Sequence, residues 1–171
     1  MEIPGLGALT PDPGHDGYRS DPMPVPGLGG AVCAVVFPDC DGGPVAEDLL
    51  AAAVAFLALD ASVLRAAAGP IFEYYEDVVS VLGEDLPDRV AGPAEVLAHI
   101  RPGREALVER DGDEVYVSVE CECSWEPEHG LQLVFLGGRT VSKVGPYDGH
   151  LTHHPRFPGE NVAGVVYQRM L

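Results

Sequence analysis

The stretch Glu114–Trp125 reads EVYVSVECECSW, and its apolar and polar residues alternate along the chain. The residues of one parity are all apolar or weakly polar, namely Val115, Val117, Val119, Cys121, Cys123 and Trp125. A period of two is that of a β-strand with one face in the core and one face in solvent. The stretch therefore predicts a strand whose two thiols share the dry face.

Short links on both sides of this strand predict an antiparallel β-meander over residues 104–145. Asp111-Gly112 precedes the strand, and a two-residue Asp-Gly link favours a hairpin because both residues tolerate positive φ. This link would place Val115 opposite Val108. Gly137-Gly138 is a second tight link between two extended runs. Four antiparallel strands follow from these signals.

The segment 44–100 is rich in Ala and predicts helices that pack against the meander. Pro44 suits the first position of a helix that would run to about Ala58. Gly69-Pro70 is expected to end a second helix, because Pro cannot continue a helical hydrogen-bond ladder. The apolar spacing over 71–82 predicts a third helix. The predicted fold class is therefore α+β.

The two ends of the chain predict different structures. The first thirty residues contain six Pro and seven Gly, a density that favours a flexible arm over residues 1–17. Residues 18–171 are then expected to form a single α+β domain. Within it, Ala31–Phe37 is continuously apolar and predicts a strand buried on both faces and added at an edge of the sheet. Val162–Tyr167 is expected to form a last strand.

The composition restricts the kinds of partner. Asp and Glu number 27 against 10 Lys and Arg, which gives a net charge of −17. Such a charge repels phosphate backbones and anionic lipid, so it disfavours nucleic acid and membranes and favours a basic protein or a cation. The start lacks the features of a signal peptide, and the longest apolar run is too short to cross a bilayer. We therefore expect a cytoplasmic protein with four reduced cysteines.

Two runs carry a resemblance to other proteins. CECSWEPEHGLQLVF at 121–135 and VGPYDGHLT at 144–152 resemble an uncharacterised family of bacterial proteins that contain a domain of unknown function. Some of its relatives look like immunity or toxin-associated proteins. The resemblance implies a small bacterial cytoplasmic protein and brings no catalytic residue or cofactor with it.

Carboxylates and imidazoles gather in two predicted loops, after the alternating strand and after the meander. The candidate binding residues are Trp125, Glu126, Glu128, His129, Asp148 and His150. An acid beside a His can bind a divalent ion or do acid–base work. The same residue types also bond exposed backbone amides in turns that contain Pro.

The helical segment offers a candidate patch for a basic partner. It consists of Glu73, Tyr74, Glu76 and Asp77, which combine aromatic area with negative charge. The alternative interpretation of the same residues is a solvated helix face with Tyr rings at its border.

A metal site is the alternative to a binding surface. Zinc or another divalent cation would take its ligands from Cys121, Cys123, His129, His150, His153 and His154. One residue separates the two cysteines, whereas zinc knuckles have two, and both thiols share the dry parity of the strand. Core packing therefore competes with this interpretation.

No nucleotide-binding loop, nucleophile elbow or metalloprotease motif occurs in the sequence. The favoured function is a non-enzymatic, acidic binding protein without a cofactor, of the immunity type that the resemblance implies. The alternative is a metal-binding module or metal-dependent enzyme that uses the Cys121, Cys123 and His cluster.

Overall fold

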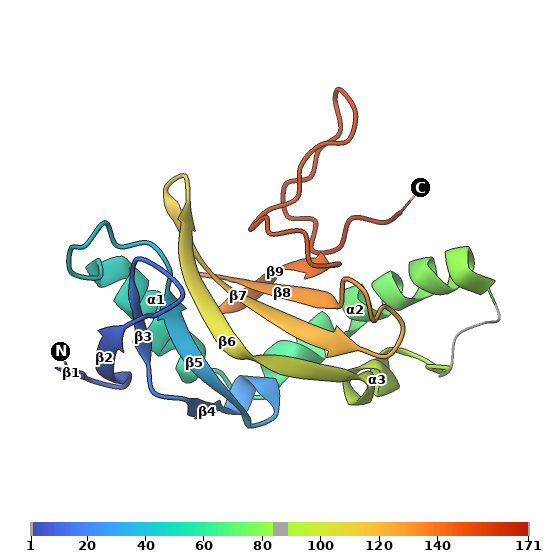
Figure 1. Cartoon of the computed structure of the whole chain (residues 1–171). Coiled ribbons are helices and arrows are strands. Elements are labelled where there is room, and N and C mark those ends of the chain that lie inside the picture. The colour runs from blue at the N-terminus through green and yellow to red at the C-terminus, as the bar shows by residue number, and fades with distance from the viewer. Residues whose placement is uncertain (1, 84–88, 171) are drawn as a thin grey trace.

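A computed structural model describes residues 2–83 and 89–170, and it contains nine strands in one sheet with helices packed on one side (Figure 1). The strands are β1 Glu2–Ile3, β2 Gly7–Pro11, β3 Tyr18–Ser20, β4 Met23–Val25, β5 Ala31–Phe37, β6 Ile100–Asp111, β7 Glu114–Cys123, β8 Leu131–Leu136 and β9 Thr140–Gly145. The α-helices are α1 Glu47–Leu57, α2 Ser62–Leu82 and α3 Pro93–Val96, and short 3-10 turns cover Pro26–Leu28 and Leu97–His99. The α+β class is confirmed.

The sheet order is β1, β2, β3, β5, β6, β7, β8, β9, and β4 also pairs with β5. All of these neighbours are antiparallel except β5 and β6, which are parallel. A parallel pair needs a long crossover, and the helices between β5 and β6 provide it. Helix α1 packs on β6 and β7, and α2 packs on β9.

The predicted meander is present as β6, β7, β8 and β9, but its first hairpin has a different register. Val108 pairs with Val117, and Arg110 pairs with Val115, so the expected pairing of Val115 with Val108 was wrong by two residues. The reason is that the two turn residues are Gly112 and Asp113, whereas the prediction used Asp111 and Gly112. Asp111 is therefore the last residue of β6 and pairs with Glu114, and Gly112 takes the positive φ of 60°. A shift of two residues keeps every side chain on its predicted face.

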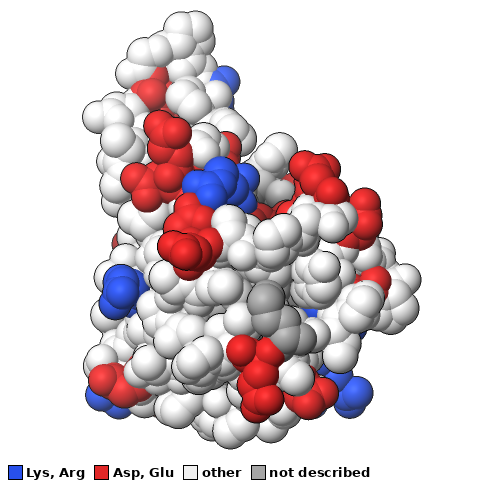
Figure 2. All heavy atoms as spheres, turned by 90° about the vertical axis from the view of Figure 1, so that its left-hand side faces the viewer, with Lys and Arg blue, Asp and Glu red and all other residues white. Residues whose placement is uncertain are grey.

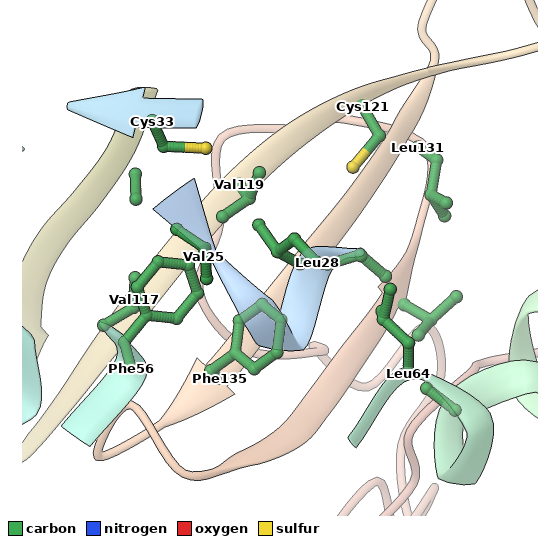
Figure 3. Packing of buried hydrophobic residues seen from close by; sticks show 14 of the residues in the cluster. Val25, Leu28, Cys33, Phe56, Leu64, Val117, Val119, Cys121, Leu131 and Phe135 are labelled. Carbon is green, nitrogen blue, oxygen red and sulfur yellow. The ribbon is translucent and has the colours of Figure 1, made fainter. Parts of the chain in front are cut away.

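The core lies between the helices and the inner face of the sheet (Figure 3). Val117 and Val119 are fully buried there, as the alternation predicted. The rings of Phe56 and Phe135 meet edge to face at 5.2 Å between centroids. Burying each such side chain contributes about 1.5 to 3 kcal/mol of transfer free energy.

Strand β5 has the predicted bounds but lies inside the sheet. It pairs with β6, the outer strand of the meander, as expected of a strand added at the meander's edge, but β3 and β4 pair with its other side. Its residues Val35 and Phe37 are fully buried, which agrees with the continuous apolar run. Pairing on both sides satisfies the backbone hydrogen-bonding groups of this buried strand.

The N-terminal residues belong to the sheet, in contrast to the unpaired arm expected for 1–17. Strand β2 pairs with β1 and β3, and Leu6 and Leu9 are buried. Gly5 and Gly7 adopt φ of 81° and 77°, so they supply the bend between β1 and β2. The Gly and Pro residues thus shape turns between short paired strands.

Helix α2 continues through Gly69-Pro70, where the sequence predicted an end. Pro70 removes one helical hydrogen bond, a local cost of about 3 kcal/mol in a helix interior. Ala67 and Ile71 on either side are buried in the core, and this packing keeps the helix continuous.

Within the described residues no single helix is long and apolar enough to cross a bilayer, and α1 with α2 reach that length only as a pair bent by 90°.

The C-terminal residues 146–170 contain no helix or strand of their own within the described part of the chain (Figure 1, orange to red). The strand expected over Val162–Tyr167 is reduced to one bridge, in which Tyr167 pairs in parallel with Val144. The Val144 N–H donates to the Val166 carbonyl over 2.7 Å. Side-chain contacts, described below, hold the rest of this segment.

Candidate functional site

The turn between β7 and β8 brings Glu126, Glu128 and His129 together as predicted. One oxygen of the Glu126 carboxylate accepts the N–H groups of Glu128 and His129, at 3.1 and 3.3 Å. The His129 Nδ1 lies 3.6 Å from the same oxygen. One potential ligand atom from each of the three side chains lies within 4.8 Å of the others, and residues 2–83 and 89–170 hold no second group of this kind. Such a trio could hold a divalent cation.

Asp148 and His150 lie near this turn but take a different role. The Tyr147 N–H donates to the His129 carbonyl over 3.2 Å, so the two loops adjoin. The Asp148 carboxylate, however, accepts a hydrogen bond from Lys143 at 2.5 Å and from the His150 N–H at 2.9 Å. Partial burial acts to raise the pKa of Asp148, but the hydrogen bond and charge of Lys143 outweigh it and hold the pKa below its usual value.

Trp125 lies in the core, although it was predicted as a binding residue. It is 1% exposed, and its ring meets Tyr74 and Tyr75 edge to face at centroid distances of 6.0 and 5.7 Å. Its parity in the alternating stretch already indicated this position. A buried indole contributes to packing and is closed to a partner.

Within the described residues, no three of the six residues of the alternative metal site bring their ligand atoms together. Cys121 and Cys123 are buried in the core, and burial raises the pKa of both thiols, that of Cys123 to about 11. His153 is half-buried and contacts the Val166 carbonyl at 2.9 Å. The rings of His150 and His154 meet edge to face at 5.0 Å. Buried protonated thiols make poor metal ligands, because the thiolate is the ligating form.

The predicted acidic patch on α2 is largely covered by the C-terminal segment. Glu73 and Glu76 are exposed, but Tyr74 is fully buried and Asp77 is 7% exposed. Tyr167 donates its hydroxyl hydrogen to Asp77 over 2.9 Å. Part of this patch is therefore already occupied by the C-terminal segment of the same chain.

The structure brings together a larger acidic surface that sequence reasoning missed. It consists of the segments 11–18, 38–48 and 109–114, which contain two, four and four Asp or Glu residues and a single Arg; we call it the acidic end. The backbones of Asp16 and Asp39 form an isolated parallel β-bridge, and Arg110 forms an ion pair with Asp48. The exposed acids are Asp16, Asp39, Asp41, Glu47, Asp48, Asp111, Asp113 and Glu114.

Topology explains this convergence. Strands β5 and β6 are parallel, so both finish at the same end of the sheet. The segments that follow them therefore lie together at that end, beside the β2–β3 turn. Figure 2 faces this side of the molecule and shows several groups of Asp and Glu, most of them in its upper half, with a group of Lys or Arg among them. Each segment is acidic in the sequence, but only the crossover connection makes them neighbours.

The local electrostatics of the acidic end reflect this crowding. Partial burial raises the pKa of Cys40, and the charges of Asp39, Asp16 and Asp41 raise it further. Burial also raises the pKa of Glu109. These shifts are those expected where negative charges repel one another and where a carboxyl group is partly withdrawn from water.

Asp12 anchors the turn beneath these charges. Its carboxylate accepts the Gly14 N–H at 2.6 Å and lies 3.4 Å from the Arg19 guanidinium and 3.5 Å from the His15 ring. The acidic end thus combines a buried, paired acid with many exposed ones.

Comparison with family models adds one match. A model described as a domain of unknown function, DUF6985, matches residues 5–151. The chain belongs to this family. Comparison with curated proteins and with solved structures finds no match. The DUF6985 region contains the three acidic segments and the Glu126 turn, whereas Tyr167 and its neighbours lie beyond it.

Proposed function

We propose that this DUF6985 protein is a non-enzymatic binding protein whose acidic end contacts a basic region of a protein partner. One observation carries the proposal: 11–18, 38–48 and 109–114 meet at one end of the sheet with eight exposed carboxylates, while Arg110 pairs with Asp48 and Arg19 pairs with the buried Asp12. Lys and Arg side chains of a partner would relieve the repulsion among these acids. The same field would raise the rate of association at low salt.

The proposed partner is a basic protein, with nucleic acid and membranes disfavoured. The net charge of −17 opposes contact with phosphate backbones and anionic lipid. An immunity-type inhibitor of a basic toxin in a bacterial cytoplasm is the specific form we propose. A dense carboxylate surface suits that role, because it masks cationic groups on the partner and steers the encounter.

The test measures how tightly two variants of equal net charge bind a fluorescent decalysine peptide. The acidic-end variant carries Asp39→Asn, Asp41→Asn, Asp111→Asn and Asp113→Asn. The control variant carries Asp21→Asn, Glu120→Gln, Glu122→Gln and Glu128→Gln, at exposed positions elsewhere. Each variant removes four of the 17 net negative charges.

We expect the acidic-end variant to bind the peptide about ten-fold more weakly at 50 mM salt. The reason is that it loses four exposed ion pairs with Lys side chains of the peptide, each of modest strength. The control should stay within about two-fold of the unmodified chain, and its binding should keep the same salt dependence. Equal losses in both variants would show that only net charge matters, and the proposed surface would then be wrong.

A second candidate function is divalent cation binding at Glu126, Glu128 and His129. The specific observation is that their ligand atoms lie within 4.8 Å of one another. Calorimetric titration with Zn²⁺ should give one site in the unmodified chain and none in a His129→Ala, Glu128→Gln variant. Cys121→Ser should leave this site unchanged, because Cys121 is buried in the core. Loss of zinc binding in the Cys121 variant alone would favour a thiol site.

A further inference from the structure

The carboxylate of Asp77 is paired by the C-terminal segment of the chain. Tyr167 donates its hydroxyl hydrogen to one oxygen at 2.9 Å, and the Met170 N–H donates to the same oxygen at 2.7 Å. The Arg169 Nε lies 3.4 Å from the other oxygen. The Asp77 side chain is only 10% exposed, so these donors replace the water that the carboxylate loses.

The same segment makes further contacts along α2. Arg169 pairs with Glu76 at 3.2 Å and donates to the Glu73 carbonyl at 3.1 Å. The Tyr167 ring lies 5.7 Å from that of Tyr74 between centroids. One extended stretch therefore places an aromatic hydroxyl and, two residues later, a guanidinium on one acidic helix face.

The attachment of this segment resembles that of a bound peptide. Residues 165–170, which we call the tail segment, pair with β9 at one bridge and make no further ladder within the described chain. Residues 146–164 connect them to the sheet without regular secondary structure. The tail segment also lies outside the DUF6985 region, which ends at 151. Main-chain pairing at a sheet edge, combined with side-chain contacts, is a common way to bind extended peptides.

We propose that α2 and the end of β9 form a peptide-binding site, which the tail segment fills in competition with a partner. The partner is an extended protein segment with a Tyr-x-Arg pattern, because this is the chemistry that now satisfies Asp77, Glu76 and the Glu73 carbonyl. The site is separate from the acidic end, and it goes beyond the binding function proposed above. A tethered tail keeps the site closed until a partner of sufficient affinity or concentration displaces it.

The test uses the full chain and a labelled peptide of residues 162–170, VAGVVYQRM. The receptor variant carries Tyr167→Phe and Arg169→Ala, which keeps the aromatic ring and removes the polar side-chain contacts of Tyr167 and Arg169 with α2, while the Met170 N–H contact with Asp77 remains. We expect it to bind the peptide at least about ten-fold more tightly than the unmodified chain, in which the tethered tail competes at high effective concentration. Fluorescence anisotropy measures both affinities.

Two controls assign the binding to Asp77. Adding Asp77→Asn to the receptor variant should weaken peptide binding at least about ten-fold, because a neutral amide loses the charged acceptor. A peptide with Arg169→Glu should fail to bind the receptor variant, and this control leaves the protein unaltered. Equal peptide affinity in the unmodified chain and the receptor variant would overturn the proposal.

A further outcome would identify a different occupant. If light scattering shows that the unmodified chain is a dimer and the peptide dissociates it, the site takes the tail of a second copy. That result would overturn the proposal of a foreign partner. A monomer at all concentrations that binds the peptide only after the tail is weakened supports it.

Discussion

The Nζ of Lys143 lies 2.5 Å from a carboxylate oxygen of Asp148, and this contact joins the loop after β9 to the sheet. Lys143 is 1% exposed and also donates to Gln132 at 3.1 Å, while Gln132 donates to Ser118 at 3.0 Å. A polar chain thus crosses three neighbouring strands on the face opposite the core. The carboxylate is about half exposed, so a buried cation meets a partly solvated anion.

Removal of the Asp148 charge should destabilise the protein more than removal of the Lys143 charge. Asp148→Asn leaves the buried ammonium without an anion, and we expect a loss of about 1 to 3 kcal/mol in the free energy of unfolding. Lys143→Met keeps the volume of the side chain and removes the charge, so its cost should be smaller. Urea unfolding measures both, with Asp113→Asn as an exposed control. A larger loss in Lys143→Met would contradict this account.

The same pair predicts how stability depends on pH. The pKa of Asp148 is lower in the folded state than in the unfolded state, so the folded state holds its proton less readily. The contribution of Asp148 is therefore fully present above the unfolded pKa, about 3.9, and is lost as pH falls through the lowered native pKa. Between pH 7 and pH 3, Asp148→Asn should lose less stability than the unmodified chain. Parallel curves for the two proteins would refute this assignment.

Thiol labelling should distinguish Cys40 from the other three cysteines. Cys40 is partly exposed, whereas Cys33, Cys121 and Cys123 are buried in the core. Burial raises the pKa of all four thiols, so labelling at pH 8 is expected to be slow and to begin at Cys40. The buried thiols should react about a hundred-fold more slowly, because they need local unfolding to reach the reagent. Mass spectrometry of iodoacetamide adducts gives the order, and early labelling of Cys121 would argue against the core described here.

Gly17→Ala tests whether the N-terminal strands are part of the fold. A Cβ at position 17 would lie 1.7 Å from the Phe37 carbonyl oxygen, which is backbone and cannot rotate away. We expect a destabilisation of about 2 to 4 kcal/mol. Gly14→Ala is the matched control, because its Cβ would meet the Asp12 carboxylate at 3.3 Å and no backbone. Thermal unfolding that is equal for both variants would mean that the turn between β2 and β3 is not held against β5.

Local patterns predicted those parts of the site that are close in sequence. Glu126, Glu128 and His129 share one turn, so their proximity needs no distant contact. Asp148 was expected to join them, but Lys143 binds it. Lys143 lies between Ser142 and Val144 in a strand, and a charged residue within a strand was the available signal that it needs an anion nearby.

The sequence by itself determined the features that depend on neighbours along the chain. The alternation over Glu114–Trp125 assigned each side chain to a face, including the burial of Cys121, because a strand has a period of two, but Tyr116 and Ser118 on the expected solvent face are buried as well. Tertiary structure decided the rest. It kept α2 continuous through Pro70, since packing on both sides outweighs one missing hydrogen bond. It gathered the acidic end through the parallel pairing of β5 and β6, and it placed Tyr167 on Asp77, 90 residues away. Contacts between such distant residues depend on how the whole chain packs, and no local period encodes them.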